Sequence, residues 1–212
     1  MTTVLVDYES GNLHSAEKAF RRMAREIGAG GVIVSDRAED VAAADRIVLP
    51  GDGAFPACKR ALEAREGLHE AIVEAVERKG RPFLGICVGM QMMARAGHEY
   101  ETVPGFGWID GEVVRIAPPD PALKIPHMGW NDLTLLRDHP VLEGLATGDH
   151  AYFVHSYHMA MDVPDQLLAT ADYGMPVTAI VAHGTTIGTQ FHPEKSQGPG
   201  LRLIANFLAW SP

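Results

Sequence analysis

The residues of this chain that could do chemistry are a cysteine and a later histidine–glutamate pair. Cys87 lies within Gly-Ile-Cys-Val-Gly-Met-Gln at 85–91, directly after the apolar run 82–86, and His192-Pro193-Glu194 follows much later. A strand that enters a glycine-flanked residue and leaves as a helix turns sharply and exposes that residue. At a helix start, unpaired backbone N–H groups and the helix dipole favour thiolate over thiol. The sequence therefore predicts a thiol nucleophile at Cys87.

His192 and Glu194 are spaced so that they can act together on this thiol. The proline between them biases His192 toward an extended backbone, and residues two apart on an extended segment project to the same side. A carboxylate beside an imidazole fixes its tautomer, while the imidazole takes the thiol proton and later protonates a leaving amine. We therefore predict a Cys-His-Glu triad. Taken singly, a cysteine is more often a core residue and a histidine a surface residue.

An acyl intermediate also needs hydrogen-bond donors for its oxyanion. The backbone N–H of Val88, directly after the nucleophile, is placed to supply one. The second must come from a neighbouring loop. Pro-Gly-Asp-Gly at 50–53 follows a predicted strand, and its glycines would let the backbone approach a substrate closely. An ordinary strand-to-helix turn is an equally good interpretation of this loop from spacing alone.

A sheet must position these residues, and the first half of the chain predicts one. Apolar strand-like runs alternate with helical segments, which is typical of a parallel sheet covered by helices on both faces. Ligands of such sheets collect beyond the carboxyl ends of the strands, where the loop after Leu49 and the elbow at Cys87 both lie. The two loops can therefore share a pocket. The predicted strands are 3–6, 32–35, 46–49 and 82–86, and the predicted helices are 12–27 and 67–78.

From Gly111 onward the pattern changes to short runs broken by Gly, Pro and Asp, which we interpret as antiparallel additions to the sheet. A last helix is expected over about 200–210. No internal repeat or low-complexity linker divides the chain, so 1–212 is predicted to form one α/β domain with a mixed sheet. The short runs are 112–116, 132–136, 168–171, 177–181 and 185–189.

Composition excludes several classes of protein. The 212 residues are 46% hydrophobic and 21% charged, as in an ordinary globular domain. The formal charge of −9, with no block of Lys and Arg, argues against a nucleic-acid partner. No apolar stretch approaches the ~20 residues that span a bilayer, so no membrane association is expected. Cys58 and Cys87 cannot form a disulfide framework, and the strand-like run 1–7 has neither a basic flank nor a cleavage site, so a cytoplasmic location is expected.

The other histidines, cysteine and glycines give weaker signals. His155 and His158 are three apart in a strand-like segment, which sends them to opposite faces, and no ligand set accompanies them, so no metal is expected. Gly51-Asp52-Gly53 does not continue with the spacing of a dinucleotide site, so no nucleotide cofactor is expected. Cys58 has no nearby histidine in sequence and is interpreted as packing.

The motifs at 85–91 and 191–194 (Phe-His-Pro-Glu) resemble those of the triad, or class I, glutamine amidotransferases, whose many members share them. Four further segments resemble the branch of that family that serves histidine biosynthesis, and Pro-His-Met-Gly-Trp-Asn at 126–131 is absent from other amidotransferases. The resemblance covers essentially the whole chain and implies the family's flavodoxin-like α/β fold. The four segments are 7–13, 124–131, 152–157 and 188–196.

The resemblance implies that glutamine is hydrolysed to glutamate and ammonia through a thioester on Cys87, with His192 as base and then acid and Glu194 orienting it. It implies no cofactor. It also implies that ammonia passes to a separate (βα)8-barrel cyclase subunit, which makes imidazole glycerol phosphate and AICAR in a heterodimer. The matching positions are Gly53 and Val88 for the oxyanion; Gly51, Gln91, Glu99, Ser156 and Tyr157 for glutamine; and Asn12, Trp130, Asn131 and Lys195 for the partner.

Two residues depart from the family's pattern. Asp52 lies in the oxyanion loop, where the family usually has an apolar residue. A carboxylate that pointed inward would oppose both the thiolate and the developing oxyanion, so we expect Asp52 to face solvent. Glu9 stands where the family often has glycine, in a loop that faces the partner.

Three alternatives remain open from the sequence. The same chemistry could serve another acceptor, as in anthranilate, guanylate or pyridoxal phosphate synthesis. A catalytically silent binding module could share the fold, with Asp52 beside the oxyanion site. A cysteine-dependent α/β-hydrolase would place its acid before the histidine in the chain, whereas Glu194 follows His192.

Overall fold

The computed structural model of the chain describes residues 1–9 and 12–212. The first half alternates strands and helices, as predicted, and two short helices that were not predicted add to it. The elements of this half are β1 (Thr2–Val6), α1 (Leu13–Ile27), β2 (Gly31–Ser35), α2 (Ala38–Ala43), β3 (Arg46–Leu49), α3 (Phe55–Glu63), α4 (Leu68–Val73) with a π-helical turn (Glu74–Arg78), β4 (Phe83–Ile86) and α5 (Val88–Gln91).

The second half is mostly strands and ends in a helix. Its elements are β5 (Ala94–Gly97), β6 (Val103–Pro104), β7 (Ile109–Arg115), β8 (His127–Asp132), β9 (Thr134–Leu135), β10 (His150–His155), β11 (Tyr157–Met161), β12 (Leu167–Asp172), β13 (Pro176–His183), β14 (Thr186–Thr189) and α6 (Gln197–Ala209), with 3-10 turns at Pro140–Leu142, Pro164–Gln166 and Pro193–Lys195.

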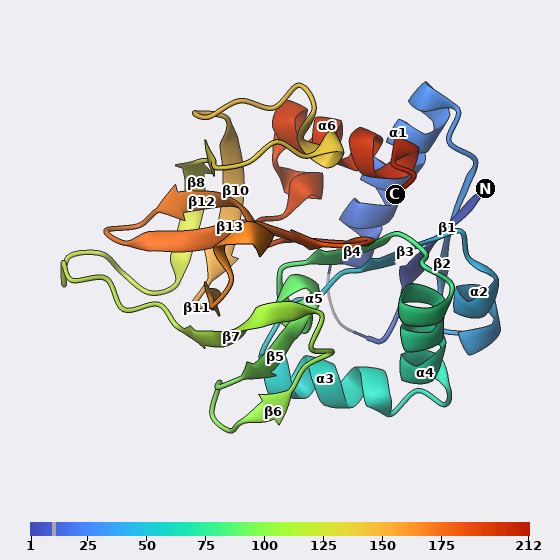
Figure 1. The fold of residues 1–212 in the computed structure, drawn as a ribbon, viewed down its shortest axis with the longest axis horizontal. Helices are drawn as coiled ribbons and strands as arrows, with labels where there is room; N and C mark the ends of the chain where they lie inside the picture. Colours follow the sequence, from blue (N-terminus) through green and yellow to red (C-terminus); the bar gives the residue numbers. More distant parts are fainter. Residues whose placement is uncertain (10–11) are drawn as a thin grey trace.

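Within the described residues the main sheet has eight strands in the order β2-β1-β3-β4-β14-β13-β12-β9. The neighbours from β2 to β14 are parallel, and those from β14 to β9 are antiparallel. Figure 1 shows α1 and α6 above this sheet and α3 and α4 below it. The predicted mixed sheet with helices on both faces is confirmed.

The parallel strands form because they can be buried on both faces. β3 and β4 are entirely buried, and such strands read as continuous apolar runs rather than as an alternating pattern. Helix α1 packs a face of residues three and four apart against the sheet, including Phe20 and Met23, and it ends at Gly28, whose φ of 68° suits glycine. The core therefore lies between the sheet and its two helical layers.

One strand of the second half contradicts the sequence-based expectation. The run 185–189, expected to be an antiparallel addition, forms β14, which pairs parallel with β4 and antiparallel only with β13. The reason is topological: β13 and β14 form a hairpin whose second strand enters beside β4. This pairing matters for the site, because it brings the residues after β14 next to those after β4.

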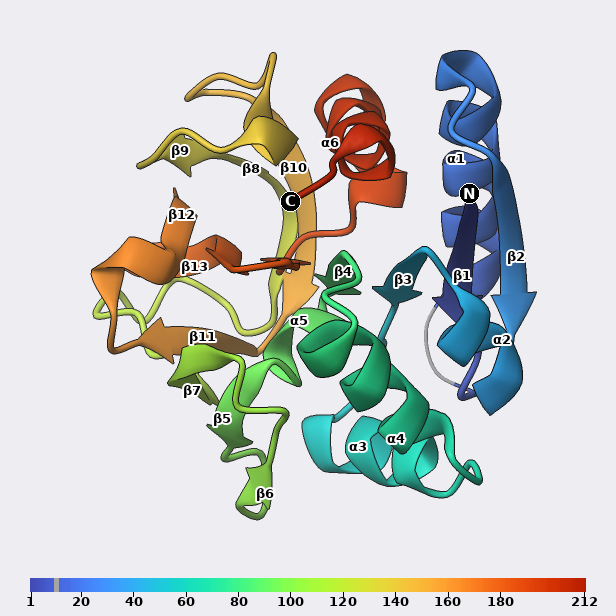
Figure 2. The same cartoon turned by 45° about the vertical axis from the view of Figure 1, so that its right-hand side comes forward.

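Two smaller sheets were not predicted as separate units. β8 pairs with β10, and β11, β7, β5 and β6 form a second small sheet. Figure 2 shows β8 and β10 standing beside α6. The segment through His155 and His158, expected to be one strand, breaks at Ser156: β10 ends at His155 and β11 begins at Tyr157 in another sheet.

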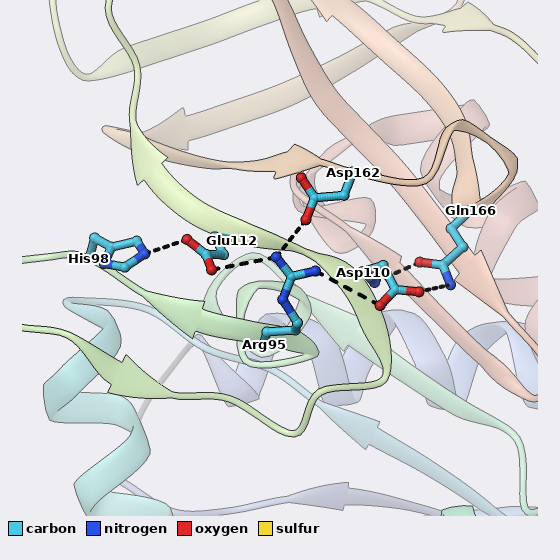
Figure 3. Close-up of polar contacts among 6 residues, drawn as sticks. All are labelled: Arg95, His98, Asp110, Glu112, Asp162 and Gln166. Carbon is cyan, nitrogen blue, oxygen red and sulfur yellow. Dashed lines mark hydrogen bonds and ion pairs between the residues drawn. The ribbon is translucent and has the colours of Figure 1, made fainter.

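A guanidinium group ties the second small sheet together (Figure 3). Arg95 on β5 forms ion pairs with Glu112 on β7, at 3.4 Å, and with Asp162, which follows β11, at 2.5 Å. His98 lies 2.8 Å from Glu112, and its hydrogen bond, followed by that of Arg95, lowers the pKa of this carboxyl. The cluster therefore joins three strands through charge on an exposed surface.

No helix in the part of the chain that the structure describes is long and apolar enough to cross a membrane.

Candidate active site

Cys87 occupies the sharp turn that the sequence predicts. It lies between β4 and α5, with φ 54° and ψ −112°, a conformation that residues other than glycine rarely adopt. A side chain at Gly89 would collide with the backbone carbonyl of Leu49, so glycine is required for the turn to pack against β3. α5 has only four residues, so its dipole contributes less to a thiolate than the sequence-based argument assumed.

Neighbouring parallel strands bring the predicted triad together. Thr189, the last residue of β14, lies opposite Ile86, the last residue of β4, and the N–H of Cys87 donates to the carbonyl of Thr189 at 2.7 Å. On the other side of β4, Leu49 of β3 lies opposite Gly85. The elbow, the His-Pro-Glu segment and the 50–53 loop therefore leave the sheet at one edge, as the argument from carboxyl ends requires.

His192 and Glu194 form a buried ion pair. Nδ1 of His192 lies 2.9 Å from Oε1 of Glu194, and both side chains are 3% exposed. The backbone of His192 is fixed by its N–H, which donates to Tyr152 O at 3.1 Å, and by the hydroxyl of Ser196, which donates to His192 O at 2.6 Å. Ser196 was not predicted to take part in the site, although a hydroxyl two residues beyond the predicted acid could have suggested it.

The charge of His192 is stabilised by its neighbours. Burial by itself lowers the pKa of this ring, but Cys87 and then Glu194 outweigh burial and raise the pKa to about 10. Among the described residues, Nε2 of His192 has no partner that meets hydrogen-bond geometry, although Cys87 is near enough to produce this effect. Such contacts often tighten only when substrate is bound. The arrangement suits a thiolate beside an imidazolium.

The sulfur is buried but borders a pocket. Cys87 is 4% exposed, yet it lines a pocket of about 190 Å³ together with most of the positions matched to glutamine binding. A larger hollow of about 600 Å³ between α1 and β2 contains no thiol, so size does not identify the site. The lining residues of the smaller pocket are Asp52, Gly53, Cys87, Val88, Gln91, Glu99, Pro126, Val154, His155, Ser156 and Tyr157.

Glu99 is held in this pocket by a helix. Its side chain is 9% exposed, and Oε2 accepts a hydrogen bond from the N–H of Phe55, the first residue of α3, at 2.8 Å. A carboxylate at a helix start is favoured by the unpaired N–H groups there. The geometry therefore presents a fixed negative charge to the pocket, which suits an ammonium group of a ligand.

Two residues of the loop 50–53 line the pocket, and a third packs against neighbouring side chains. Gly53, with φ 117°, and Asp52 line the pocket. Asp52 is exposed, but because it also borders the pocket of the thiol, its orientation toward solvent stays a prediction. Gly51 does not line the pocket. Its missing side chain leaves room for Val88 and for the hydroxyl of Tyr8, which donates to Pro50 O at 2.6 Å. The structure thus gives Gly51 a packing role, and its contact with substrate stays a prediction.

A glutamine to which the sequence analysis gave no role contacts the sulfur. Nε2 of Gln190 lies 3.6 Å from Sγ of Cys87, and Oε1 of Gln190 accepts from Nε2 of Gln91 at 3.1 Å. Gln91 also donates to Tyr157 O at 3.0 Å. A polar residue at the end of a buried strand, two positions before His192, was the available signal.

The buried histidines pair with each other. Nδ1 of His127 lies 2.9 Å from Nε2 of His155, and Nδ1 of His155 lies 2.8 Å from Tyr157 O. Burial lowers the pKa of His127 to about 4 and that of His155 to about 3, so both rings are neutral at pH 7. Among residues 1–9 and 12–212, no group of three or more His, Cys, Asp or Glu side chains could hold a metal ion.

The residues matched to the partner-facing surface lie on three elements. Trp130 on β8 is 48% exposed, with its ring against Tyr152. Lys195 ends the turn after His192 and shares a hollow with α1. Asn12 caps α1 by accepting from Ser15 N at 3.4 Å, and the amide of Asn131 turns inward to His127.

Glu9 and the first discriminating segment are only partly described. Ser10 and Gly11 of the segment 7–13 lie outside the described residues. Glu9 has φ 64°, which explains why glycine suits this position, and its carboxylate pairs with Arg65 at 2.7 Å.

Comparisons with known proteins agree with this geometry. The family model "Glutamine amidotransferase class-I" matches residues 4–210. The chain is 72% identical to "Imidazole glycerol phosphate synthase subunit HisH" of Cereibacter sphaeroides and 65% identical to the protein of the same name from Ruegeria pomeroyi, over the full length of each chain. A solved structure described as "Crystal structure of glutamine amidotransferase" has the same fold, with a TM-score of 0.73 at 20% identity, over 98% of this chain and 99% of the other. The chain belongs to the class I glutamine amidotransferase family.

Proposed function

We propose that this chain is the glutaminase subunit of an imidazole glycerol phosphate synthase. The observation that carries the proposal is that Cys87, beside the His192–Glu194 pair, borders a pocket that also holds the fixed carboxylate of Glu99. Full-length identity to proteins named as this subunit supports the choice among amidotransferases. Other synthases that share the triad are not favoured by a specific observation.

The mechanism follows from the placement of these groups. The Cys87 thiolate attacks the side-chain amide carbon of glutamine, and the oxyanion accepts hydrogen bonds from backbone N–H groups of Val88 and Gly53. The imidazolium of His192 gives a proton to the amide nitrogen, so ammonia leaves and a thioester remains. His192 then takes a proton from water, whose oxygen attacks the thioester and releases glutamate. Glu194 keeps the ring oriented throughout.

Ammonia is the product that this subunit delivers. We propose that a (βα)8-barrel cyclase subunit docks on the face that carries Trp130 and Lys195 and uses the ammonia to make imidazole glycerol phosphate and AICAR in histidine biosynthesis. An exposed aromatic residue is a common interface anchor, which supports Trp130 in that role. The cytoplasmic location expected from the sequence remains a prediction.

The Cys87→Ala variant in complex with the cyclase subunit tests the proposal. We expect glutamine-dependent synthesis of imidazole glycerol phosphate to be lost, while synthesis from added ammonium salt continues, because only the supply of ammonia is removed. Glutamate release at the wild-type rate by Cys87→Ala would remove this thiol from the mechanism. If the cyclase did not co-purify with the chain and a different synthase bound to it instead, that synthase would be the acceptor of the ammonia.

A further inference from the structure

The fully buried side chain of Gln190 contacts the nucleophile but has no part in the mechanism above. It follows β14 directly, is 0% exposed, and is fixed at its backbone by a hydrogen bond from its N–H to Ala179 O at 2.9 Å. Its Nε2 lies 3.6 Å from Sγ of Cys87, within the range of a hydrogen bond to sulfur. A buried amide needs hydrogen-bond partners for its oxygen and for its NH2 group, so the partners show which of the two faces the sulfur.

The orientation of the Gln190 amide is set by the backbone carbonyl of Tyr157, which can only accept hydrogen bonds. The carbonyl of Tyr157 faces the Gln91 amide at 3.0 Å, so Gln91 must present its NH2 group there. The same NH2 group lies 3.1 Å from Gln190, which must therefore present its oxygen to Gln91. The remaining end of Gln190, its NH2 group, is left facing the sulfur. The donor toward Cys87 thus follows from the network.

The carbonyl of Tyr157 is itself held by the histidine pair. It accepts from Nδ1 of His155 at 2.8 Å, so Nε2 of His155 is the acceptor for Nδ1 of His127 at 2.9 Å. Nε2 of His127 in turn accepts from Nδ2 of Asn131 at 3.1 Å, and this amide also donates to Asp172 O at 2.8 Å. Every donor meets an acceptor from Asp172 on β12 to Cys87, so the network has one consistent assignment of donors and acceptors.

A hydrogen-bond donor beside the sulfur of Cys87 stabilises its thiolate form and its thiol form to different extents. An N–H group bonds more strongly to a thiolate than to a neutral thiol, so Gln190 favours the charged nucleophile. Gln190 approaches the sulfur from the end of β14. The short helix α5 supplies little dipole, which leaves His192 and Gln190 as the side chains that support the charge.

We propose that Gln190 is a further residue of the nucleophilic machinery, one that stabilises the Cys87 thiolate by an N–H···S hydrogen bond and is oriented by Gln91 and the Tyr157 carbonyl. The proposal rests on the proposed glutaminase function, in which Cys87 is the nucleophile.

The test compares Gln190→Met with wild type in the complex with the cyclase subunit. Methionine keeps the length of the side chain and removes the donor, and Gln190→Asn keeps the amide but falls short of the sulfur. Gln166→Met is the matched control, because Gln166 is also a buried, hydrogen-bonded glutamine but contacts Asp110 in the small sheet instead of the site (Figure 3). The readouts are the rate of iodoacetamide alkylation of Cys87 against pH, by peptide mass spectrometry, and kcat and KM for glutamine.

We expect Gln190→Met and Gln190→Asn to be alkylated about tenfold more slowly at neutral pH, with the midpoint of the alkylation profile moved upward, because one charge-assisted hydrogen bond is lost. We expect kcat to fall by about the same factor, with KM within about twofold of wild type. Gln166→Met should match wild type in both readouts.

Three results would overturn the proposal. Alkylation and kcat equal to wild type in both variants would show that the contact does nothing. A raised KM with unchanged kcat would assign Gln190 to glutamine binding, and loss of the fold in both variants would assign it to packing. Absence of glutaminase activity in the wild-type complex would instead be a failure of the proposed function, and the alkylation profile would still report on Gln190.

Discussion

At the scale of single residues, the structure explains how a histidine can stay charged in a buried site. His192 is 2% exposed, and burial opposes its charge, but Cys87 and Glu194 raise its pKa to about 10. The imidazolium is therefore present at neutral pH before glutamine binds, ready to protonate the leaving nitrogen. Removing either neighbour should return the ring toward the neutral form.

Glu194→Gln tests this view of His192. Glutamine keeps the shape of the side chain and removes its charge, so we expect the pKa of His192 to fall and kcat for glutamate release to drop at least about tenfold, with little change in KM. The ring pKa is measured by NMR titration and the rates by a glutamate assay. An unchanged ring pKa would contradict the role of Glu194, whatever the effect on rate.

The neutral histidine pair predicts a loss of stability in acid. The pKa values of His127 and His155 lie below the ordinary value of 6.5, at about 4 and about 3. Between pH 6.5 and these values the unfolded chain binds more protons than the folded chain, so stability falls as pH falls, by about 1.4 kcal/mol per pH unit for each ring.

His127→Phe isolates one of these rings. Phenylalanine retains the stacking on Phe153 and Tyr173, so the fold should survive, although His155 and Asn131 lose a partner. In urea titrations at pH 5 and 6, we expect the free energy of unfolding to fall less steeply with pH than in wild type, by about 1.4 kcal/mol per pH unit. An identical slope in the two proteins would mean that His127 is charged in the folded state.

Some residues of the site could be predicted from the sequence, and others could not. Cys87, His192 and Glu194 could be proposed from residue type and local spacing, because glycines, a proline and a two-residue spacing act over short distances. The partners of Gln190 are Gln91, Tyr157 and Cys87, which are far apart along the chain, so its orientation could only come from the fold. Glu99 was reached through the family resemblance, since its contact with Phe55 is likewise non-local.

At the scale of elements, the site depends on how closely the elbow packs on its neighbour. Gly89→Ala would place a methyl group against the backbone carbonyl of Leu49, which cannot move without shifting β3. We expect a loss of roughly 1–3 kcal/mol in the free energy of unfolding, together with a loss of glutaminase activity, because the turn at Cys87 must open. Gly31→Ala on β2 is the matched control, since a side chain there meets nothing within 4 Å.

Denaturant titration and a glutamate assay measure both effects. A stable and fully active Gly89→Ala protein would show that the elbow tolerates a wider turn, and the requirement for glycine would then be wrong.

Strands that are buried on both faces were predicted correctly. The prediction failed for β14, where pairing with neighbouring strands decides the direction of the strand. β1, β3 and β4 read as apolar runs because both of their faces are covered, and the predicted helix 12–27 matches α1, which Asn12 caps. The direction of β14 could not be read, since the same residues suit a parallel or an antiparallel neighbour. The helix α3 was missed although Phe55, Cys58 and Leu62 bury one face at helical spacing.

At the scale of the whole molecule, one edge of the sheet gathers three loops from distant parts of the chain. β3, β4 and β14 are adjacent and parallel, so the 50–53 loop, the elbow and the His-Pro-Glu turn leave the sheet side by side. The loop and the elbow line the pocket, and the turn brings His192 to the Cys87 sulfur that borders it. Val154 of β10, Ser156 and Tyr157, the first residue of β11, then close the pocket from the side of the two small sheets. The fold thus explains why residues with no local relationship form one site.

The most direct test of the central claim is covalent labelling of the wild-type complex by a glutamine analogue that carries an electrophilic carbon in place of the amide. Intact-mass and peptide mass spectrometry locate and count the label. We predict a stoichiometric adduct on Cys87, prevented by excess glutamine and absent in Cys87→Ala, with Cys58 unlabelled. Wild-type protein that releases glutamate but carries no adduct on Cys87, or carries it on another residue, would contradict the proposed nucleophile.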